Sequence, residues 1–195
     1  MRTRDKILDR SLVVFASRGY EATSLDSLAG DLGITKQAIL YYFGSKDALM
    51  EAVMAESIER LGEALGPALS KPDRGWDKIE AVVRASFDVV AVQPELLGIL
   101  REAARLGGTW AGQATTQMEP LLDRASEFLA DEVAAGRLQP HDHRIMLLAG
   151  FSMVAGVATD QEVMRAVGVE PTTRSLVRAR RELLRVLRAA LAPVN

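Results

Sequence analysis

The sequence predicts an all-α protein in which a small three-helix domain precedes a larger helical domain. Every convincing hydrophobic period along the 195 residues is helical, and no segment shows a sustained two-residue alternation. Hydrophobic residues form 48% of the chain, which is typical of a globular protein and far from a disordered one. We expect about nine helices, divided between a domain of residues 1–47 and a domain of residues 48–195.

Three short helices are predicted in the first domain. The first has an apolar face of Ile7, Leu8, Leu12 and Phe15, and Gly19 follows it at the position of a C-terminal cap. The second begins after Thr23, which stands three residues before Asp26 in a capping-box spacing, and ends at Gly33. The third runs over residues 36–43 and is capped by Thr35.

Longer helices are predicted in the second domain. The fourth helix begins after the capping residue Ser45 and ends near Gly66 and Pro67. A glycine-rich link is expected at residues 105–115. The remaining helices are expected at residues 76–92, from Pro94 to the link, and at residues 116–135, 141–164 and 173–191.

Composition excludes several classes of protein. The chain has no cysteine, which excludes disulfides and thiolate chemistry and is typical of a reducing compartment. The N-terminus lacks the apolar run of a signal peptide. The longest uncharged apolar segment, residues 145–159, is shorter than the ~20 residues that span a bilayer. We therefore expect a cytoplasmic protein without a membrane partner.

The segment "GITKQAILYYFGSKDAL", residues 33–49, differs from the slightly acidic remainder of the chain. It combines two lysines with three consecutive aromatic residues, and it has no acidic residue between Ile34 and Lys46. Two short helices joined by a turn at Gly33 have helix-turn-helix geometry, and glycine accepts the positive φ that such a turn needs. Five apolar side chains are expected to bury the corner: Leu25, Leu28, Ile34, Ile39 and Phe43.

The outward side chains of this segment suit double-stranded DNA. The first residues of a helix that enters the major groove lie at the base edges. Gln37 can pair with adenine, Lys36 can reach guanine or a phosphate, and Ala38 can approach a thymine methyl group. Tyrosine hydroxyls and lysine ammonium groups bind phosphates, which set the register without reading the sequence.

These residues carry a family resemblance. The segment "TSLDSLAGDLGITKQAILYYFGSKDAL" resembles the DNA-binding domain of the TetR family of bacterial transcriptional regulators. Where the family usually has tyrosine this chain has Leu40, and where it often has glycine this chain has Gln37; whether Leu40 alters DNA contacts is open. The DNA-contacting residues are predicted to be Thr23, Ser24, Thr35, Lys36, Gln37, Ala38, Tyr41, Tyr42 and Lys46.

A homodimer on a palindromic operator is predicted, because one short recognition helix reads only a few base pairs. Two such helices are usually placed ~34 Å apart by a two-fold axis. The last helix has a broad leucine stripe, and residues 150–159 are rich in small side chains that let helices approach closely. The interface is predicted to contain Leu148, Ser152, Ala155, Thr159, Val177, Leu184, Leu187 and Leu191. The resemblance likewise implies four helices at the interface.

The last helix also carries an arginine face. Residues 173–195 hold six arginines and one glutamate. Pairing with the acidic middle of the chain, plain solvation and a second nucleic-acid surface are the alternatives for this face.

The resemblance implies a ligand cavity in the larger domain and an unknown small-molecule effector. The effector would favour a spacing of the DNA-binding heads that does not match the operator, and it would thereby release a repressor from DNA. The fourth helix, which joins both domains, would transmit the change. Residues available to line the cavity are Phe87, Leu97, Leu100, Arg101, Arg105, Trp110, Met118, Leu122 and Phe151, and Glu102 could add polarity.

An enzyme, or an all-helical sensor that does not bind DNA, is the alternative class. The chain has no phosphate-cradling glycine loop and no Gly-x-Ser-x-Gly motif, so we expect no catalytic residues and no cofactor. His141 and His143 flank Asp142, but residues two apart do not share a helix face. Asp142 is better interpreted as a helix cap, and no metal site is predicted.

Overall fold

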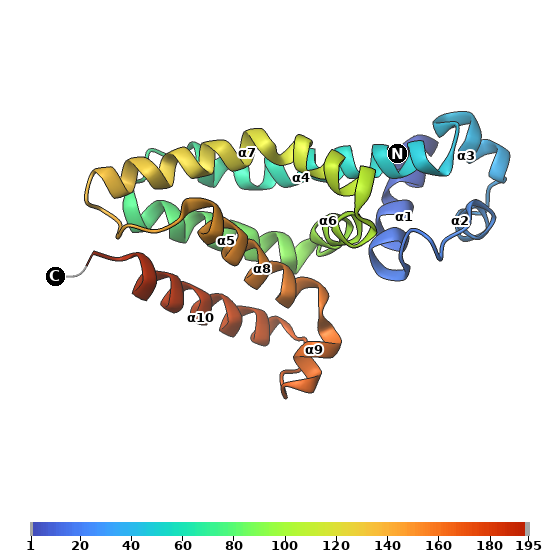
Figure 1. The fold of residues 1–195 in the computed structure, drawn as a ribbon. Helices are drawn as coiled ribbons and strands as arrows, with labels where there is room; N and C mark the ends of the chain where they lie inside the picture. The colour runs from blue at the N-terminus through green and yellow to red at the C-terminus, as the bar shows by residue number, and fades with distance from the viewer. Residues whose placement is uncertain (1, 194–195) are drawn as a thin grey trace. The chain divides into compact units, whose positions relative to one another are not determined.

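The computed structural model describes residues 2–193 and contains helices and no strands over that range. The all-α prediction is therefore confirmed (Figure 1). The helices are α1 (Thr3–Arg18), α2 (Leu25–Leu32), α3 (Lys36–Phe43), α4 (Lys46–Ser70), α5 (Gly75–Val92), α6 (Glu95–Leu106), α7 (Gly108–Ala134), α8 (His143–Thr159), α9 (Gln161–Ala166) and α10 (Thr173–Leu191).

Contacts along the chain define two compact units. The first comprises the chain up to Leu61 together with Glu95–Gln117, and the second comprises Gly62–Pro94 and the chain from Met118 onward. The predicted boundary at residues 47 and 48 is a different division, because the helix-turn-helix segment shares its unit with α4 up to Leu61 and with α6. The division at residues 47 and 48 stays a prediction about function.

In the first unit, α1 packs against both α2 and α6, and α2 packs against α3. The approach of α1 to α6 is close, since a Cβ added at Gly98 would lie 3.0 Å from the Cβ of Ala16. The fully buried side chains of this unit include Ile7, Phe15, Leu28, Ile39, Leu49, Met54 and Ile99. The apolar face predicted for the first helix is thus its buried face.

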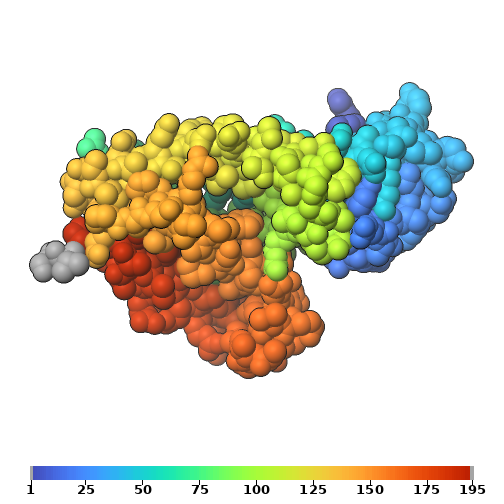
Figure 2. All heavy atoms as spheres, viewed as in Figure 1, coloured from blue at the N-terminus to red at the C-terminus, as the bar shows by residue number. Residues whose placement is uncertain are grey.

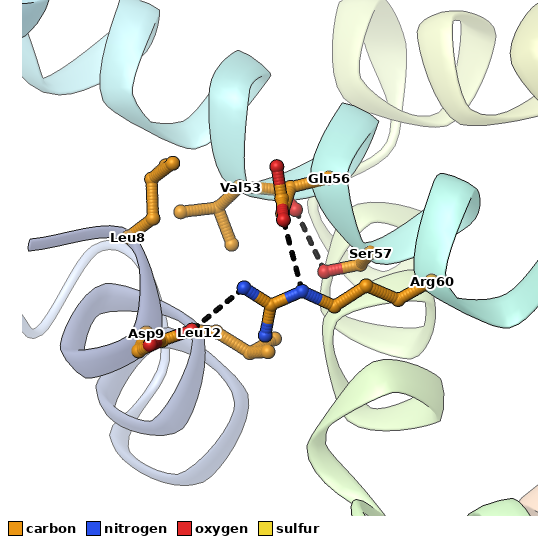
Figure 3. A pocket seen from close by; sticks show the side chains of 7 residues that line it. All are labelled: Leu8, Asp9, Leu12, Val53, Glu56, Ser57 and Arg60. Atoms are coloured by element: carbon orange, nitrogen blue, oxygen red, sulfur yellow. Dashed lines mark hydrogen bonds and ion pairs between the residues drawn. The ribbon is translucent and has the colours of Figure 1, made fainter. Parts of the chain in front are cut away.

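The contact between α1 and α4 also has a polar part, shown in Figure 3. The guanidinium of Arg60 lies between the helices, with its Nη2 2.7 Å from Asp9 Oδ1 and its Nε 3.0 Å from Glu56 Oε1. The apolar side chains beside it come from Leu8, Leu12 and Val53. Arg60 therefore joins α4 to α1 within the same unit.

In the second unit, α5 packs against α8 and α10. The buried side chains of this unit include Phe87, Val90, Leu129, Leu138, Val154, Leu183, Leu187 and Leu191. The buried carboxylate of Glu132 fixes the start of α5, because its Oε2 accepts the Gly75 N–H at 2.7 Å and its Oε1 accepts Arg137 Nη2 at 2.9 Å. Arg137, followed by the Gly75 N–H, holds the pKa of Glu132 below its usual value against the opposing effect of burial.

Two predicted breaks are wrong. Helix α4 continues through Pro67 to Ser70, because Leu65 and Ala68 extend its buried face and outweigh the loss of one backbone hydrogen bond. The expected irregular link at residues 105–115 is mostly helical, and only Gly107 separates α6 from α7.

The predicted helix over residues 141–164 is in turn two helices, because Asp160 ends α8 and begins α9.

Candidate nucleic-acid interface

The turn between α2 and α3 has the geometry that the sequence predicts. Gly33 lies in the left-handed region, with φ +65°, and its N–H donates to the carbonyls of the last turn of α2. The Ile34 N–H then donates to the Ala29 carbonyl at 3.0 Å. Thr35 caps α3, since its Oγ1 accepts the Ala38 N–H at 3.2 Å. These bonds fix the direction in which α3 leaves the turn.

Helix α3 has a buried face and an exposed face. Ile39 and Phe43 are buried, whereas Thr35, Gln37, Tyr41 and Tyr42 are exposed. Tyr41 is 84% exposed, and its ring meets that of Tyr42 edge to face with centroids 5.3 Å apart. In Figure 2 the light-blue segment that contains α3 lies at the molecular surface. An exposed aromatic pair beside an exposed amide is an unusual surface for a protein in water, and it suits a nucleic-acid backbone.

The two predicted DNA-contacting lysines are each engaged within the unit. Lys36 Nζ lies 2.9 Å from Asp26 Oδ2 on α2, in an exposed ion pair. Lys46 Nζ lies 4.1 Å from the centroid of the Tyr20 ring. Burial lowers the pKa of Lys46. Both lysines have part of their surface open to solvent.

The remaining predicted residues differ in exposure. Ser24 is exposed and caps α2 by accepting the Ser27 N–H at 3.0 Å. Thr23, expected from the sequence to cap this helix, is only 4% exposed, and its hydroxyl donates to the Gly19 carbonyl at 2.8 Å. Ala38 is half-buried. Thr23 therefore stabilises the turn between α1 and α2 from inside, and Ser24 takes the capping position.

Arginines on α1 hold α2 in place. Arg10 donates to Asp31 through Nε at 3.1 Å and Nη2 at 2.5 Å, and Arg18 Nη1 approaches the same oxygen at 3.4 Å. The hydrogen bond from Arg10 holds the pKa of Asp31 below its usual range. The orientation of α2, and through the turn that of α3, is thus tied to α1.

The residues predicted to line a ligand cavity are divided between the two units. The first unit holds Leu97, Leu100, Arg101, Arg105 and Trp110, and the second holds Phe87, Met118, Leu122 and Phe151. Leu97, Leu100 and Phe87 are buried, and Leu122 is exposed. Trp110 packs against Tyr20 with ring centroids 5.4 Å apart. The cavity stays a prediction.

The predicted dimer residues fall into two groups. Leu148, 59% exposed, and Val177, 42% exposed, lie with exposed Ser152 on the outside of α8 and α10, and Leu184 and Thr159 are half-buried. Ala155, Leu187 and Leu191 are instead buried in their own subunit, because α10 packs its leucine stripe against α5 and α8. Figures 1 and 2 show α8 in orange beside α10 in red.

The arginine face of α10 is partly paired within the second unit. Arg180 Nη1 lies 3.6 Å from Asp88 Oδ1, and Arg185 Nη2 lies 2.7 Å from Glu182 Oε2. The guanidinium of Arg188 lies over the ring of Trp76, 5.5 Å from its centroid. Of these contacts, the one between Arg180 and Asp88 favours pairing with the middle of the chain, the first of the alternatives for this face.

The histidine pair does not form part of a larger donor cluster. His141 and His143 meet edge to face, with Nε2 of the first 3.4 Å from Nδ1 of the second. Asp142 caps α8 by accepting the Ile145 N–H at 3.0 Å, as predicted. Within residues 2–193, no three acidic or histidine side chains are grouped so as to hold a metal ion. No described helix has both the length and the apolar character needed to span a bilayer.

Sequence reasoning missed the contacts of Tyr20, and it considered Glu102 only as a polar residue near a ligand cavity. The Tyr20 hydroxyl donates to Asp47 at the start of α4, and its backbone N–H donates to Glu102 on α6. Burial, followed by the hydrogen bond to Asp47, raises the pKa of Tyr20. The partners are 27 and 82 residues apart in the sequence, so no local spacing indicates them.

Comparison with known proteins gives a family match over the helix-turn-helix segment. Residues 7–53 match the family described as bacterial regulatory proteins, tetR family. Over 88 residues, or 45% of this chain, the sequence is 35% identical to the HTH-type transcriptional regulator SrpR of Pseudomonas putida. It is also 35% identical over 88 residues to TtgW, an uncharacterised HTH-type transcriptional regulator of Pseudomonas putida. These matches span 39% of SrpR and 63% of TtgW.

The fold is shared over most of the chain with a solved structure. AibR, solved in complex with isovaleryl coenzyme A and operator DNA, superposes with a TM-score of 0.72. The alignment covers 87% of this chain and 99% of AibR at 20% sequence identity. At that identity the comparison establishes the fold alone.

Proposed function

We propose, from the match of residues 7–53 to the tetR family of bacterial regulatory proteins, that this chain is a ligand-responsive, DNA-binding transcriptional regulator. The observation that carries the proposal is the exposed face of α3, where Thr35, Gln37, Tyr41 and Tyr42 follow a left-handed glycine turn. The relatives over this segment are transcriptional regulators, which argues against an enzyme.

The proposed division of work on DNA follows from the position of each side chain on α3. Gln37, in the first turn, reads a base edge in the major groove, since its amide can both donate to and accept from adenine. Tyr41 and Tyr42, in the last turn, donate to phosphates. Lys36 and Lys46 add positive charge near the phosphates and make the affinity dependent on salt.

The proposed active form is a homodimer on a palindromic operator. The apolar side chains that remain exposed on α8 and α10 support this assembly, with Leu148 and Val177 as its central residues. Ile145 and Met153 are further exposed apolar side chains on α8. Two copies of α8 and α10 would cover these side chains and place two α3 helices on one face of the duplex.

The proposed regulation is a two-state shift that makes the protein a repressor. An effector that prefers the conformation with a mismatched head spacing lowers operator affinity by its differential affinity for the two states. A coupling of ~1–3 kcal/mol weakens DNA binding about 5–150-fold. In the proposed division, residues 1–47 bind DNA and residues 48–195 bind the effector and the second copy.

Selection from a random pool of duplexes tests the proposed function. The protein is incubated with the pool at low ionic strength, and bound duplexes are amplified through several rounds. We expect enrichment of an inverted repeat that binds with nanomolar affinity. Recovery of the starting pool without enrichment, together with no retained duplex at about 50 mM salt, would contradict DNA binding and favour a sensor that does not bind DNA.

A further inference from the structure

The turn between α1 and α2 is held by a carboxylate that lies outside the segment matched to the family. Glu102 is on α6, and its Oε1 accepts the backbone N–H of Tyr20 at 2.7 Å. The residue is only 8% exposed. Because a buried carboxylate costs free energy unless its oxygens are paired, the position of Glu102 indicates a specific partner rather than chance contact.

Two neighbours fix the orientation of this carboxylate. Arg105 donates through Nε to Oε2 at 2.7 Å and through Nη2 to Oε1 at 2.9 Å, in a two-pronged pair. On the other side lies Gly19, with φ +90°, where an added Cβ would be 3.3 Å from Oε1. The carboxylate therefore fits against the backbone of the turn, and a larger residue at position 19 would push it away.

Tyr20 connects this turn to the start of α4. Its ring lies between Phe15 and Trp110, with both centroid distances 5.4 Å. Its hydroxyl donates to Asp47, and the ammonium group of Lys46 lies over its ring. Lys46 and Asp47 open α4, which follows α3 after a short turn. Tyr20 thus donates one hydrogen bond to α6 through its backbone and one to the start of α4 through its hydroxyl. It thereby links α6 to the end of the DNA-binding segment.

We propose that Glu102 is a positioning residue for DNA binding: by holding the Tyr20 backbone, it sets the place of Lys46 and of the adjoining α3 on the duplex. The inference rests on the proposed function and extends it to a residue 49 positions beyond the matched segment, which ends at residue 53. It also implies that the DNA-binding head includes α6, since both belong to one compact unit.

Two affinities measured on each variant test this role. The full-length chain is titrated with the duplex selected by the wild type and with a random duplex of equal length, below the melting temperature of each variant. For Glu102→Ala we expect selected-duplex affinity to fall about tenfold, the equivalent of one unpaired backbone N–H. Random-duplex affinity should change less than about twofold, because phosphate attraction needs no register.

The controls separate positioning from loss of folding. Glu102→Gln keeps an acceptor for the Tyr20 N–H and should lose only about threefold in selected-duplex affinity. Glu95→Ala, on the same helix, should bind both duplexes as the wild type does. If Glu102→Ala does not fold, the same comparison is made with Glu102→Gln and Arg105→Ala. For these variants we expect the selected-duplex affinity alone to fall about threefold, because the acceptor at position 102 is no longer held in place by the charged pair.

Failure of the positioning role of Glu102 and failure of DNA binding give different results. Equal weakening on both duplexes would show a smaller folded fraction and overturn the positioning role, as would unchanged binding to the selected duplex. A wild type that selects no duplex would overturn the proposed function and this inference together.

Discussion

At the residue scale, two exposed side chains on α3 are proposed to have different tasks. Gln37 offers a donor and an acceptor on one amide, which can recognise one kind of base pair. Tyr41 offers a single hydroxyl, which can bind a phosphate at any sequence. Both are exposed, and they lie at opposite ends of the eight-residue helix. The first is expected to control specificity and the second affinity.

Substitution separates the two tasks. Gln37→Ala should remove about 1–3 kcal/mol of discrimination at one base pair of each half-site while leaving binding to random duplex unchanged. Tyr41→Phe, which removes only the hydroxyl, should weaken binding to every sequence by the same factor. Affinities for a panel of single-base operator variants measure both effects. A uniform loss for Gln37→Ala would assign Gln37 to the phosphate backbone instead.

Glu102 gives the protein an acid-sensitive contact. The hydrogen bonds from Arg105, and then the one from the Tyr20 N–H, hold the pKa of Glu102 below its ordinary value of 4.5, although burial acts in the opposite direction. The folded state therefore binds this proton more weakly than the unfolded state does. The stabilisation is complete above pH 4.5 and is lost as the pH falls through the lower pKa of the folded state.

Urea unfolding of wild type and Glu102→Gln between pH 3 and pH 7 measures this contribution. The wild type should be more stable at pH 7, and the difference should shrink steadily below pH 4.5. A difference in unfolding free energy that is the same at both ends of the range would mean that the ionisation of Glu102 is not linked to folding.

At the element scale, α10 has one buried apolar side and one exposed apolar residue. Leu183, Leu187 and Leu191 are buried within the subunit, whereas Val177 is exposed. On α8, Ala155 is buried and Leu148 is exposed. Each helix thus buries one side in its own subunit and exposes apolar residues on another, where the proposed dimer would place the second copy.

A pair of substitutions tests this division of surfaces. Leu148→Glu should produce a folded monomer with weakened operator binding, because a charge would be buried in the dimer interface. Leu187→Ala should instead lower the free energy of unfolding by about 2–5 kcal/mol, since it opens a cavity in the core of the subunit. Sedimentation and denaturant titration of both variants provide the comparison. A Leu148→Glu dimer of wild-type strength would place the interface elsewhere.

The sequence predicts caps and turns well, and it predicts contacts between residues far apart in the chain poorly. Gly33, Thr35 and Asp142 act as expected because caps and turns depend on residues three or four apart. The continuation of α4 through Pro67 depends on a buried face that propensity does not reveal. The contact of Tyr20 with Glu102 joins distant segments, and no periodicity encodes it.

The hydrophobic periodicity of α10 also does not show which of its apolar residues are buried within the subunit. A stripe of leucines indicates burial, but it does not tell a partner helix in the same chain from one in a second copy. The three-dimensional packing assigns Leu187 to the subunit core and leaves Val177 exposed.

At the scale of the whole molecule, the proposed function requires that two copies present α3 to one duplex. The half-sites of such an operator are separated by one helical turn, about 10–10.5 base pairs, or a multiple of it. A dimer of fixed geometry tolerates only that spacing, and an effector acts by changing how often the matching geometry occurs. The spacing of the operator is therefore the property that links the recognition helix, the dimer and the regulation.

Affinity for a selected operator and for the same operator with five added base pairs between its half-sites is the most direct measurement. The insertion turns one half-site to about the opposite side of the duplex. We expect the affinity of the wild-type protein for the lengthened operator to fall to that for an isolated half-site. Equal affinity for the two duplexes would contradict recognition by a rigid pair of α3 helices.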